Sequence, residues 1–278
     1  MTELLEPPLY RYMRLSSDED VEHAEDLLLR NRIYYPPMSS FNDPFEGRIN
    51  FSFEATEQEK VAHVARIIQR RLAIPYNDAK AQAPERIELN EKEGADRVRG
   101  LILNDWGVCC LSRSKNDIRM WSHYTDGHKG ICIEFAATRL DHVEFFGTIL
   151  PVHYTDQMPC VNEYKTPRHE KPKRAILTKS SQWNHEQECR AIVTDISEEN
   201  PRDRELPSGI ISGVYLGARI TDENRRRVLA WAFECESPVT VYQARLQSRE
   251  YGLAFDLVRR CCAKKATPST GASIGDAP

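Results

Sequence analysis

The second half of the chain holds a series of short segments in which apolar and polar residues alternate, with few helical patterns between them. Alternation with a period of two is typical of β-strands that have one buried face. Parallel strands need a long connection, usually a helix, between each pair. Only one Arg-rich helix, from Asp222 to Phe233, is expected in this half. The sequence therefore predicts an α+β fold in which helices flank a mixed or antiparallel sheet.

The first half predicts a strand, a helix and a second strand, followed by a helical insertion. Leu9 to Met13 alternates, apolar residues at helical spacing follow Asp18, and Ile33 to Tyr35 ends at two prolines. We expect a helical insertion over about residues 56–104. The prediction is one domain over residues 1–262 and a disordered tail over 263–278, because the tail is small, polar and contains Pro and Gly.

Composition limits the classes of function that this chain can have. It has 278 residues, of which 40% are hydrophobic, so a core can form without metal or disulfide support. The 38 basic and 42 acidic residues give a net charge of -4, which excludes an overall basic field for nucleic acid but not a local groove. No stretch approaches the roughly 18 apolar residues that a membrane span needs. Because none of the eight cysteines forms a CxxC pair and no signal peptide is visible, we expect a reduced, cytoplasmic protein without membrane contact.

Three polar clusters stand beside segments that are expected to be buried. Arg11 lies between two tyrosines, Ser112 follows a buried strand, and Glu186 and Glu188 precede a late strand. The planar fork of arginine suits it to phosphate. Two glutamates on one face of a strand repel each other, which raises one pKa or requires a cation between them. Such a pair can stabilise an oxocarbenium-like sugar and orient a nucleophile.

Each cluster also has a structural interpretation. Arg11 can be a surface residue that stacks on its tyrosines, and Ser112 a turn residue. The two glutamates can form an exposed strand edge with Arg190 as their ion-pair partner.

A short helix is expected to carry Trp121, His123 and Tyr124. These side chains can either pack the helix against the sheet or form the wall of a pocket for a planar ring. No metal is expected, because the chain has no HExxH or CxxC pattern. A Gly-rich phosphate loop is also missing from the sequence.

Seven motifs resemble those of a bacterial family catalogued as domain of unknown function 2971. They are LYRY at Leu9–Tyr12, SFNDPFE at Ser40–Glu46, SRS at Ser112–Ser114, MWSHY at Met120–Tyr124, GICIEF at Gly130–Phe135, WNHEQECR at Trp183–Arg190 and VYLG at Val214–Gly217. The family name implies no function.

Arg11, Ser112 and the Glu186-Gln187-Glu188 triplet also resemble, in chain order, the arginine, serine and E-x-E residues of ADP-ribosyltransferases. The S-T-S triplet of that superfamily is SRS in this chain, and FNDPFE has no counterpart in it. This resemblance implies a split sheet and NAD as a substrate. It implies that Arg11 holds the pyrophosphate, that Ser112 supports the strand beside the nicotinamide, and that Glu188 binds the ribose and stabilises its cation while Glu186 positions the acceptor.

The remaining predicted site residues follow from the same resemblance. We expect Tyr35, Trp121 or Tyr124 to stack on the nicotinamide or the adenine. The SFNDPFE loop would face the acceptor, and the side chains expected on that side are Asn42, Asp43, Glu46 and His123.

The leading hypothesis is therefore an NAD-dependent ADP-ribosyltransferase-like effector, a toxin or phage-defence protein, that modifies an unknown protein or nucleic-acid acceptor. One alternative is a non-enzymatic nucleotide-sensing or protein-binding module of a defence system. Another is a metal-dependent nuclease that uses Asp43, Glu46, Glu134 and Glu186. The nuclease requires that these carboxylates meet with no basic group among them. The sequence leaves the oligomeric state open.

Overall fold

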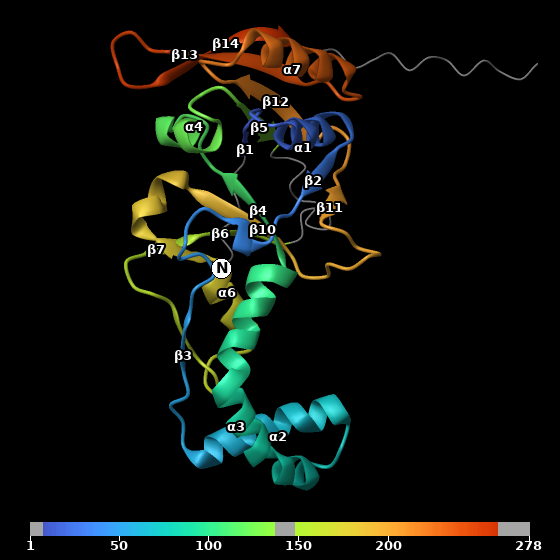
Figure 1. Cartoon of the computed structure of the whole chain (residues 1–278), viewed down its shortest axis with the longest axis vertical. Coiled ribbons are helices and arrows are strands. Elements are labelled where there is room, and N and C mark those ends of the chain that lie inside the picture. The colour runs from blue at the N-terminus through green and yellow to red at the C-terminus, as the bar shows by residue number, and fades with distance from the viewer. Residues whose placement is uncertain (1–7, 137–147, 261–278) are drawn as a thin grey trace, which may run out of the picture.

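A mixed eight-stranded sheet forms the centre of the protein (Figure 1), as seen in a computed structural model that describes residues 8–136 and 148–260. The strands lie in the order β14-β13-β12-β5-β1-β4-β10-β6, and of these neighbours only β12 and β13 are parallel. Their bounds are β1 Leu9–Met13, β4 Gly107–Ser112, β5 Ile131–Phe135, β6 Thr148–Pro151, β10 Glu188–Val193, β12 Ile211–Leu216, β13 Thr240–Leu246 and β14 Leu253–Arg260. The predicted α+β class is thereby confirmed.

The sheet opens between β1 and β4. These two strands share a single register pair, Tyr10 with Ser112. By contrast, β1 pairs with β5 along its whole length, from Leu9 to Met13, and β10 pairs with β4 from Glu188 to Val193. Beyond the Tyr10–Ser112 pair, β1 and β4 therefore diverge.

One face of the sheet carries the main hydrophobic core. It is covered by α1 (Asp18–Leu29), α7 (Asp222–Glu234) and the small sheet of β2 (Arg32–Tyr34) with β11 (Asp203–Glu205). Ser17 caps α1 in a capping box with Asp20, which fixes the start of the helix. Cys109 and Cys189 lie in this core, where a free cysteine packs as a small apolar residue.

The other face is covered by shorter elements. They are η1 (Met38–Ser40), α4 (Ile118–Tyr124), α6 (Glu170–Ile176), η4 (Ser181–Glu186) and the paired strands β7 (His153–Thr155) and β9 (Thr178–Ser180). Both Asn116 and Asp117 are residue types that favour a helix cap. The cap of α4 is Asp117, whose carboxylate accepts from the backbone N–H of Arg119, and not Asn116. The charged, Pro-containing stretch over 164–173 is typical of a loop, but its last four residues belong to α6.

Helices α2 (Glu57–Leu72), α3 (Tyr76–Gly100) and η2 (Leu101–Asp105) occupy the region of the predicted insertion and form an arm that extends from the sheet (Figure 1). We call residues 57–105 the helical arm. Beside it, β3 (Asn50–Ser52) pairs with β8 (Cys160–Asn162). Among the described residues, no helix has the length and apolar character needed to cross a membrane. The tail predicted over 263–278 lies outside the described residues. So does the segment 143–146, for which the apolar residues of the sequence favour a strand.

Candidate functional site

Five charged side chains meet in a buried position where β10 begins, and we call them the charge cluster. They are Glu46, Lys179, Glu186, Glu188 and Arg190. The ammonium of Lys179 lies 2.6 Å from Glu186 Oε2 and 3.2 Å from Glu188 Oε2. It also lies 3.2 Å from Glu46 Oε1. The guanidinium of Arg190 contacts Glu188 Oε1 at 2.8 Å and Glu46 Oε1 at 2.7 Å.

The cluster is assembled from four separate segments. Glu188 and Arg190 are two residues apart in β10, so they share a face. Glu186 ends η4, and Gln187 has a left-handed backbone with a φ of 46°, which turns the chain into β10. Lys179 comes from β9. Glu46 comes from the turn after η1, in which the backbone N–H of Glu46 bonds to the carbonyl of Asp43.

The electrostatics explain why this cluster can be buried. Burial by itself disfavours a charged Glu188, but the charges of Arg190 and Lys179 outweigh it and lower the pKa of this carboxyl to about 2. Burial likewise disfavours a charged Lys179, and the carboxylates of Glu188, Glu46 and Glu186 together raise its pKa instead. Both groups are therefore charged at neutral pH, and of the two outcomes expected for the glutamate pair, a raised pKa or a cation between the carboxylates, the structure has the cation.

Polar side chains around the cluster hold its glutamates. The Tyr124 hydroxyl donates to Glu186 Oε1 at 2.5 Å, and the Ser112 hydroxyl donates to the Glu186 carbonyl at 2.6 Å. The Tyr154 hydroxyl accepts from the backbone N–H of Glu188 at 2.8 Å. Burial, followed by the Glu186 carboxylate, raises the pKa of Tyr124. Of the predicted site residues, Ser112, Tyr124, Glu186, Glu188 and Glu46 thus meet at one place.

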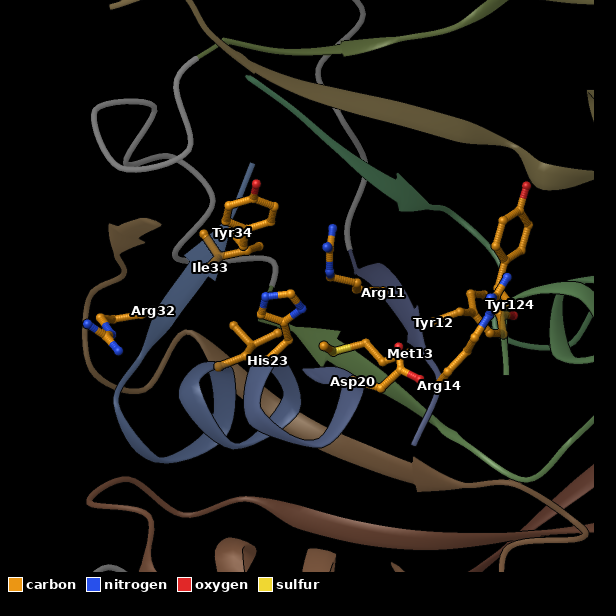
Figure 2. Close-up of a pocket in the computed structure, with 11 residues that line it drawn as sticks. Arg11, Tyr12, Met13, Arg14, Asp20, His23, Arg32, Ile33, Tyr34 and Tyr124 are labelled. Carbon is orange, nitrogen blue, oxygen red and sulfur yellow. The ribbon is translucent and has the colours of Figure 1, made fainter. Parts of the chain in front are cut away.

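A pocket of about 220 Å³ lies between β1, α1 and β2, and we call it the β1 pocket (Figure 2). Its lining consists of Arg11, Tyr12, Met13, Arg14, Asp20, His23, Leu27, Arg32, Ile33, Tyr34 and Tyr124. Arg11 lies between β1 and β4 in Figure 2, and its Nη1 donates to Cys109 Sγ on β4 at 2.7 Å. Neither Arg11 nor Arg14 forms an ion pair within the described ranges 8–136 and 148–260. Asp20, the one carboxylate of the lining, accepts from the backbone N–H groups of Ser16 and Ser17.

The β1 pocket and the charge cluster lie on opposite faces of the sheet. Tyr10 pairs with Ser112, and Ser112 pairs with Glu188, so these three side chains share one face. Arg11, the next residue after Tyr10, points to the other face. The ADP-ribosyltransferase resemblance requires Arg11, Ser112 and Glu188 to face one hollow, and this requirement is not met, because strand alternation separates Arg11 from the other two. Tyr124 connects the two places, since it lines the pocket and bonds to Glu186.

The two aromatic residues predicted to stack on NAD, besides Tyr124, lie elsewhere. Trp121 is fully buried, its indole N–H donates to the Lys115 carbonyl at 2.7 Å, and its ring meets Tyr12 edge to face. Trp121 therefore packs α4 against the sheet. Of the two roles that the sequence allows for it, this is the structural one rather than the wall of a pocket. Tyr35 is also fully buried, in the core on the Arg11 face.

The predicted acceptor-side residues are spread over the surface and the interior. His123 is exposed, and its ring centre lies 6.3 Å from that of Trp183 and 6.4 Å from that of His185. Asn42 is exposed, whereas Asp43 is buried and its carboxylate accepts from the backbone N–H of Phe45. Within this loop, Glu46 is the residue that joins the charge cluster.

The geometry does not supply what the nuclease alternative requires. Lys179 and Arg190 lie among the carboxylates of the cluster. Glu134 lies apart, where it accepts hydrogen bonds from Ser212 and Tyr215. In the part of the chain that the structure describes, no group of three or more His, Cys, Asp or Glu side chains is placed to hold a metal ion.

Sequence reasoning missed Lys179 and Tyr154, which complete the cluster, and Arg14 and Tyr34, which line the pocket. Lys179 stands in the stretch Leu177-Thr-Lys-Ser-Ser, which has no apolar alternation that would indicate a strand. Its one signal is indirect, because a buried glutamate pair needs a cation from somewhere in the chain.

Fold and site together define an α+β protein with a cationic pocket at its first strand and a buried charge cluster beside it. Residues 120–191 match the sequence model of a family described as a protein of unknown function, DUF2971. The matched stretch runs from α4 to β10 and includes Tyr124, Lys179, Glu186 and Glu188. No curated protein and no solved structure matches the chain. These comparisons support the family resemblance and give no support to the ADP-ribosyltransferase resemblance.

Proposed function

We propose that the chain binds NAD through the β1 pocket and acts as an ADP-ribosyltransferase-like effector. The observation that carries this proposal is the pair of arginines, Arg11 and Arg14, that line a pocket without carboxylate partners among the described residues. An arginine whose charge is not neutralised by a carboxylate is suited to bind phosphate oxygens. The volume of about 220 Å³ is below the roughly 300–1,000 Å³ of typical ligand pockets. The pocket therefore takes the pyrophosphate, and the rest of the dinucleotide extends past Tyr124.

In this proposal Glu186 is the carboxylate that meets the ribose. It is 2% exposed and bonded to Tyr124, so a ribose hydroxyl reaches it by taking the place of the Tyr124 hydroxyl. When the glycosidic C–N bond breaks, its electron pair leaves with nicotinamide and positive charge develops on the ribose, which a nearby carboxylate stabilises. The acceptor then forms a bond to that carbon and loses a proton.

Glu188 takes a different role from the catalytic one that the resemblance implies. Its two oxygens are held by Arg190 and Lys179, and Lys179 in turn contacts Glu186. Glu188 is therefore a positioning residue, which keeps the ammonium of Lys179 against Glu186.

A nucleotide-sensing module without turnover is the second candidate. The observation that favours it is the closure of the charge cluster, in which Glu186 and Glu188 are buried and both already contact Lys179. In such a module, the cluster stabilises the fold and NAD binding changes the exposed surface.

The test is to incubate the protein with NAD and to measure released nicotinamide by chromatography. We expect release by the wild type, retained binding without release by Glu186→Gln, and loss of both by Arg11→Ala. The matched control is Arg226→Ala, an exposed arginine of α7, which leaves both unchanged. Binding without release by the wild type supports the sensing module. Absence of NAD binding contradicts both candidates.

A further inference from the structure

The end of the helical arm carries basic residues that the proposed NAD site does not use. We call residues 66–80 the arm end; they include the last turns of α2 and the first turn of α3. In Figure 1 these helices lie at the opposite end of the molecule from α7 and β14. Val64, Ala65, Ala79 and Ala83 pack α2 and α3 together, which leaves the outer sides of both helices in solvent.

Four cations of the arm end lack an ion-pair partner among the described residues. Arg66, Arg70, Arg71 and Lys80 are all exposed. None of them forms an ion pair within the described part of the chain. Asp78 is the one acidic residue of the arm end. Elsewhere in the arm, Lys60 pairs with Glu91 and Arg99 with Asp96. Arg86, Lys92 and Arg97 form no ion pair with the described residues, but they stand among the acidic residues of α3, whereas the arm end has a single one.

The concentration of basic residues at the arm end matters because the whole chain is acidic, with a net charge of -4. A local basic surface on an acidic protein attracts anions to that place rather than to the molecule in general. The net charge excludes a basic field over the whole protein but allows a basic surface at one place. The arm end is such a surface.

The chemistry of the arm end favours phosphate. Three of the four cations are arginines, and Arg66 and Arg70 are four residues apart on α2, so they lie side by side on one helix face. Tyr76 is 36% exposed at the start of α3, where its ring can stack on a base. Ile67 and Leu72 are also exposed, but single exposed aliphatic residues are common on protein surfaces. The unpaired positive charge is therefore the informative feature.

We infer that the arm end, through Arg66, Arg70, Arg71 and Lys80, binds a nucleic-acid strand by its phosphates, with Tyr76 stacking on a base. This inference does not need the NAD site. If both hold, the arm end recruits the nucleic acid, and the proposed transferase acts on it or on a protein bound to it.

The expected binding is electrostatic and therefore depends on salt. Each neutralised phosphate contributes about 0.7 to 0.9 to the slope of log affinity against log salt. Four cations predict a slope of about -3, and reversal of two of them lowers it by about 1.5 in magnitude.

The experiment measures the fluorescence anisotropy of labelled 20-nucleotide single-stranded RNA, single-stranded DNA and duplex DNA with the full chain over a series of salt concentrations. The test variant is Arg70→Glu with Arg71→Glu. The matched control is Arg226→Glu with Arg245→Glu, which makes the same change in net charge at exposed positions outside the arm. Tyr76→Ala separates stacking from charge, since it weakens binding to single strands and leaves duplex binding unchanged. Circular dichroism confirms that each variant is folded.

We expect the test variant to lose at least about tenfold in affinity at low salt and to show the shallower slope, while the control stays within about twofold of the wild type. Equal losses in the two double variants, or equal affinities of the test variant and the wild type, overturn the inference. Tighter binding to vesicles that contain phosphatidylserine or to a poly-glutamate peptide than to any nucleic acid overturns it as well. Nicotinamide release without nucleic acid is expected to be the same in the test variant and the wild type, so this inference and the proposed NAD activity fail separately.

Discussion

At the scale of single residues, the sequence indicates that charged side chains gather around Glu186 and Glu188, but it does not show that Lys179 and Glu46 are among them. Glu186 and Glu188 stand two apart, so the need for a cation follows from the pattern, and Arg190 was recognisable as a partner of Glu188. Lys179 lies only seven residues before Glu186 but in another element, the strand β9, and Glu46 comes from a segment far away in the chain. The position of Lys179 in the cluster depends on the pairing of β9 with β7, and the position of Glu46 depends on the turn that precedes it. Neither can be derived from a local sequence pattern.

Lys179→Met tests the importance of the central cation. It leaves the carboxylates of Glu186, Glu188 and Glu46 without their shared ammonium, so we expect a loss of about 3–5 kcal/mol in the free energy of unfolding. Urea titration measures this loss. The double variant Lys179→Met/Glu186→Gln is expected to recover part of the lost free energy of unfolding, because it leaves one buried carboxylate fewer without a cation. A loss below about 1 kcal/mol in the single variant, the size typical of surface pairs, contradicts the buried role.

The pH dependence of stability follows from Glu188. Its pKa in the folded protein is about 2, below the ordinary 4.5, so its charged form stabilises the fold above about pH 4.5 and that contribution is lost as pH falls toward 2. Urea titrations between pH 7 and pH 2.5 should show falling stability in this window. Glu188→Gln is expected to be less stable at pH 7 and to have a shallower decline in the window. A decline as steep as that of the wild type would assign the effect to other carboxyls.

At the scale of elements, the sequence predicts the strands better than their neighbours. The segment Leu9 to Met13 was predicted as a strand with its observed bounds, and the alternation of its residues already separates Arg11 from Tyr10 and Tyr12. The sequence could not show that β1 lies between β4 and β5, because strand order depends on contacts far apart in the chain. That order places Ser112 on the Tyr10 face and so divides the predicted NAD residues between the two faces.

Glycine substitutions test the placement of β1. A Cβ added at Gly130, just before β5, would lie 2.1 Å from the carbonyl oxygen of Met13 in β1. Gly130→Ala must therefore shift one strand against the other, and we expect it to lower the free energy of unfolding by about 1–3 kcal/mol. The matched control is Gly100→Ala at the end of α3, where an added Cβ meets nothing within 4 Å. This change is expected to stabilise by up to about 1 kcal/mol. Similar unfolding midpoints for both variants in urea would contradict the close approach of β1 to Gly130.

At the scale of the whole molecule, composition and strand pattern were enough for the α+β class, and helices were expected where the arm is found. The orientation of the arm and the opening between β1 and β4 were not predictable, because both follow from packing between distant segments. The resulting molecule has a pocket at its first strand, the charge cluster on the opposite face and a basic surface at the arm end. Binding measurements test the pocket and the basic surface separately, and unfolding measurements test the buried charge cluster.

The most direct measurement of the central claim is calorimetric titration of NAD into the wild type, Arg11→Ala and Arg226→Ala. The account predicts saturable binding by the wild type, at least about tenfold weaker binding by Arg11→Ala, and unchanged binding by Arg226→Ala. The same affinity in all three proteins, or no heat of binding in any of them, would contradict it.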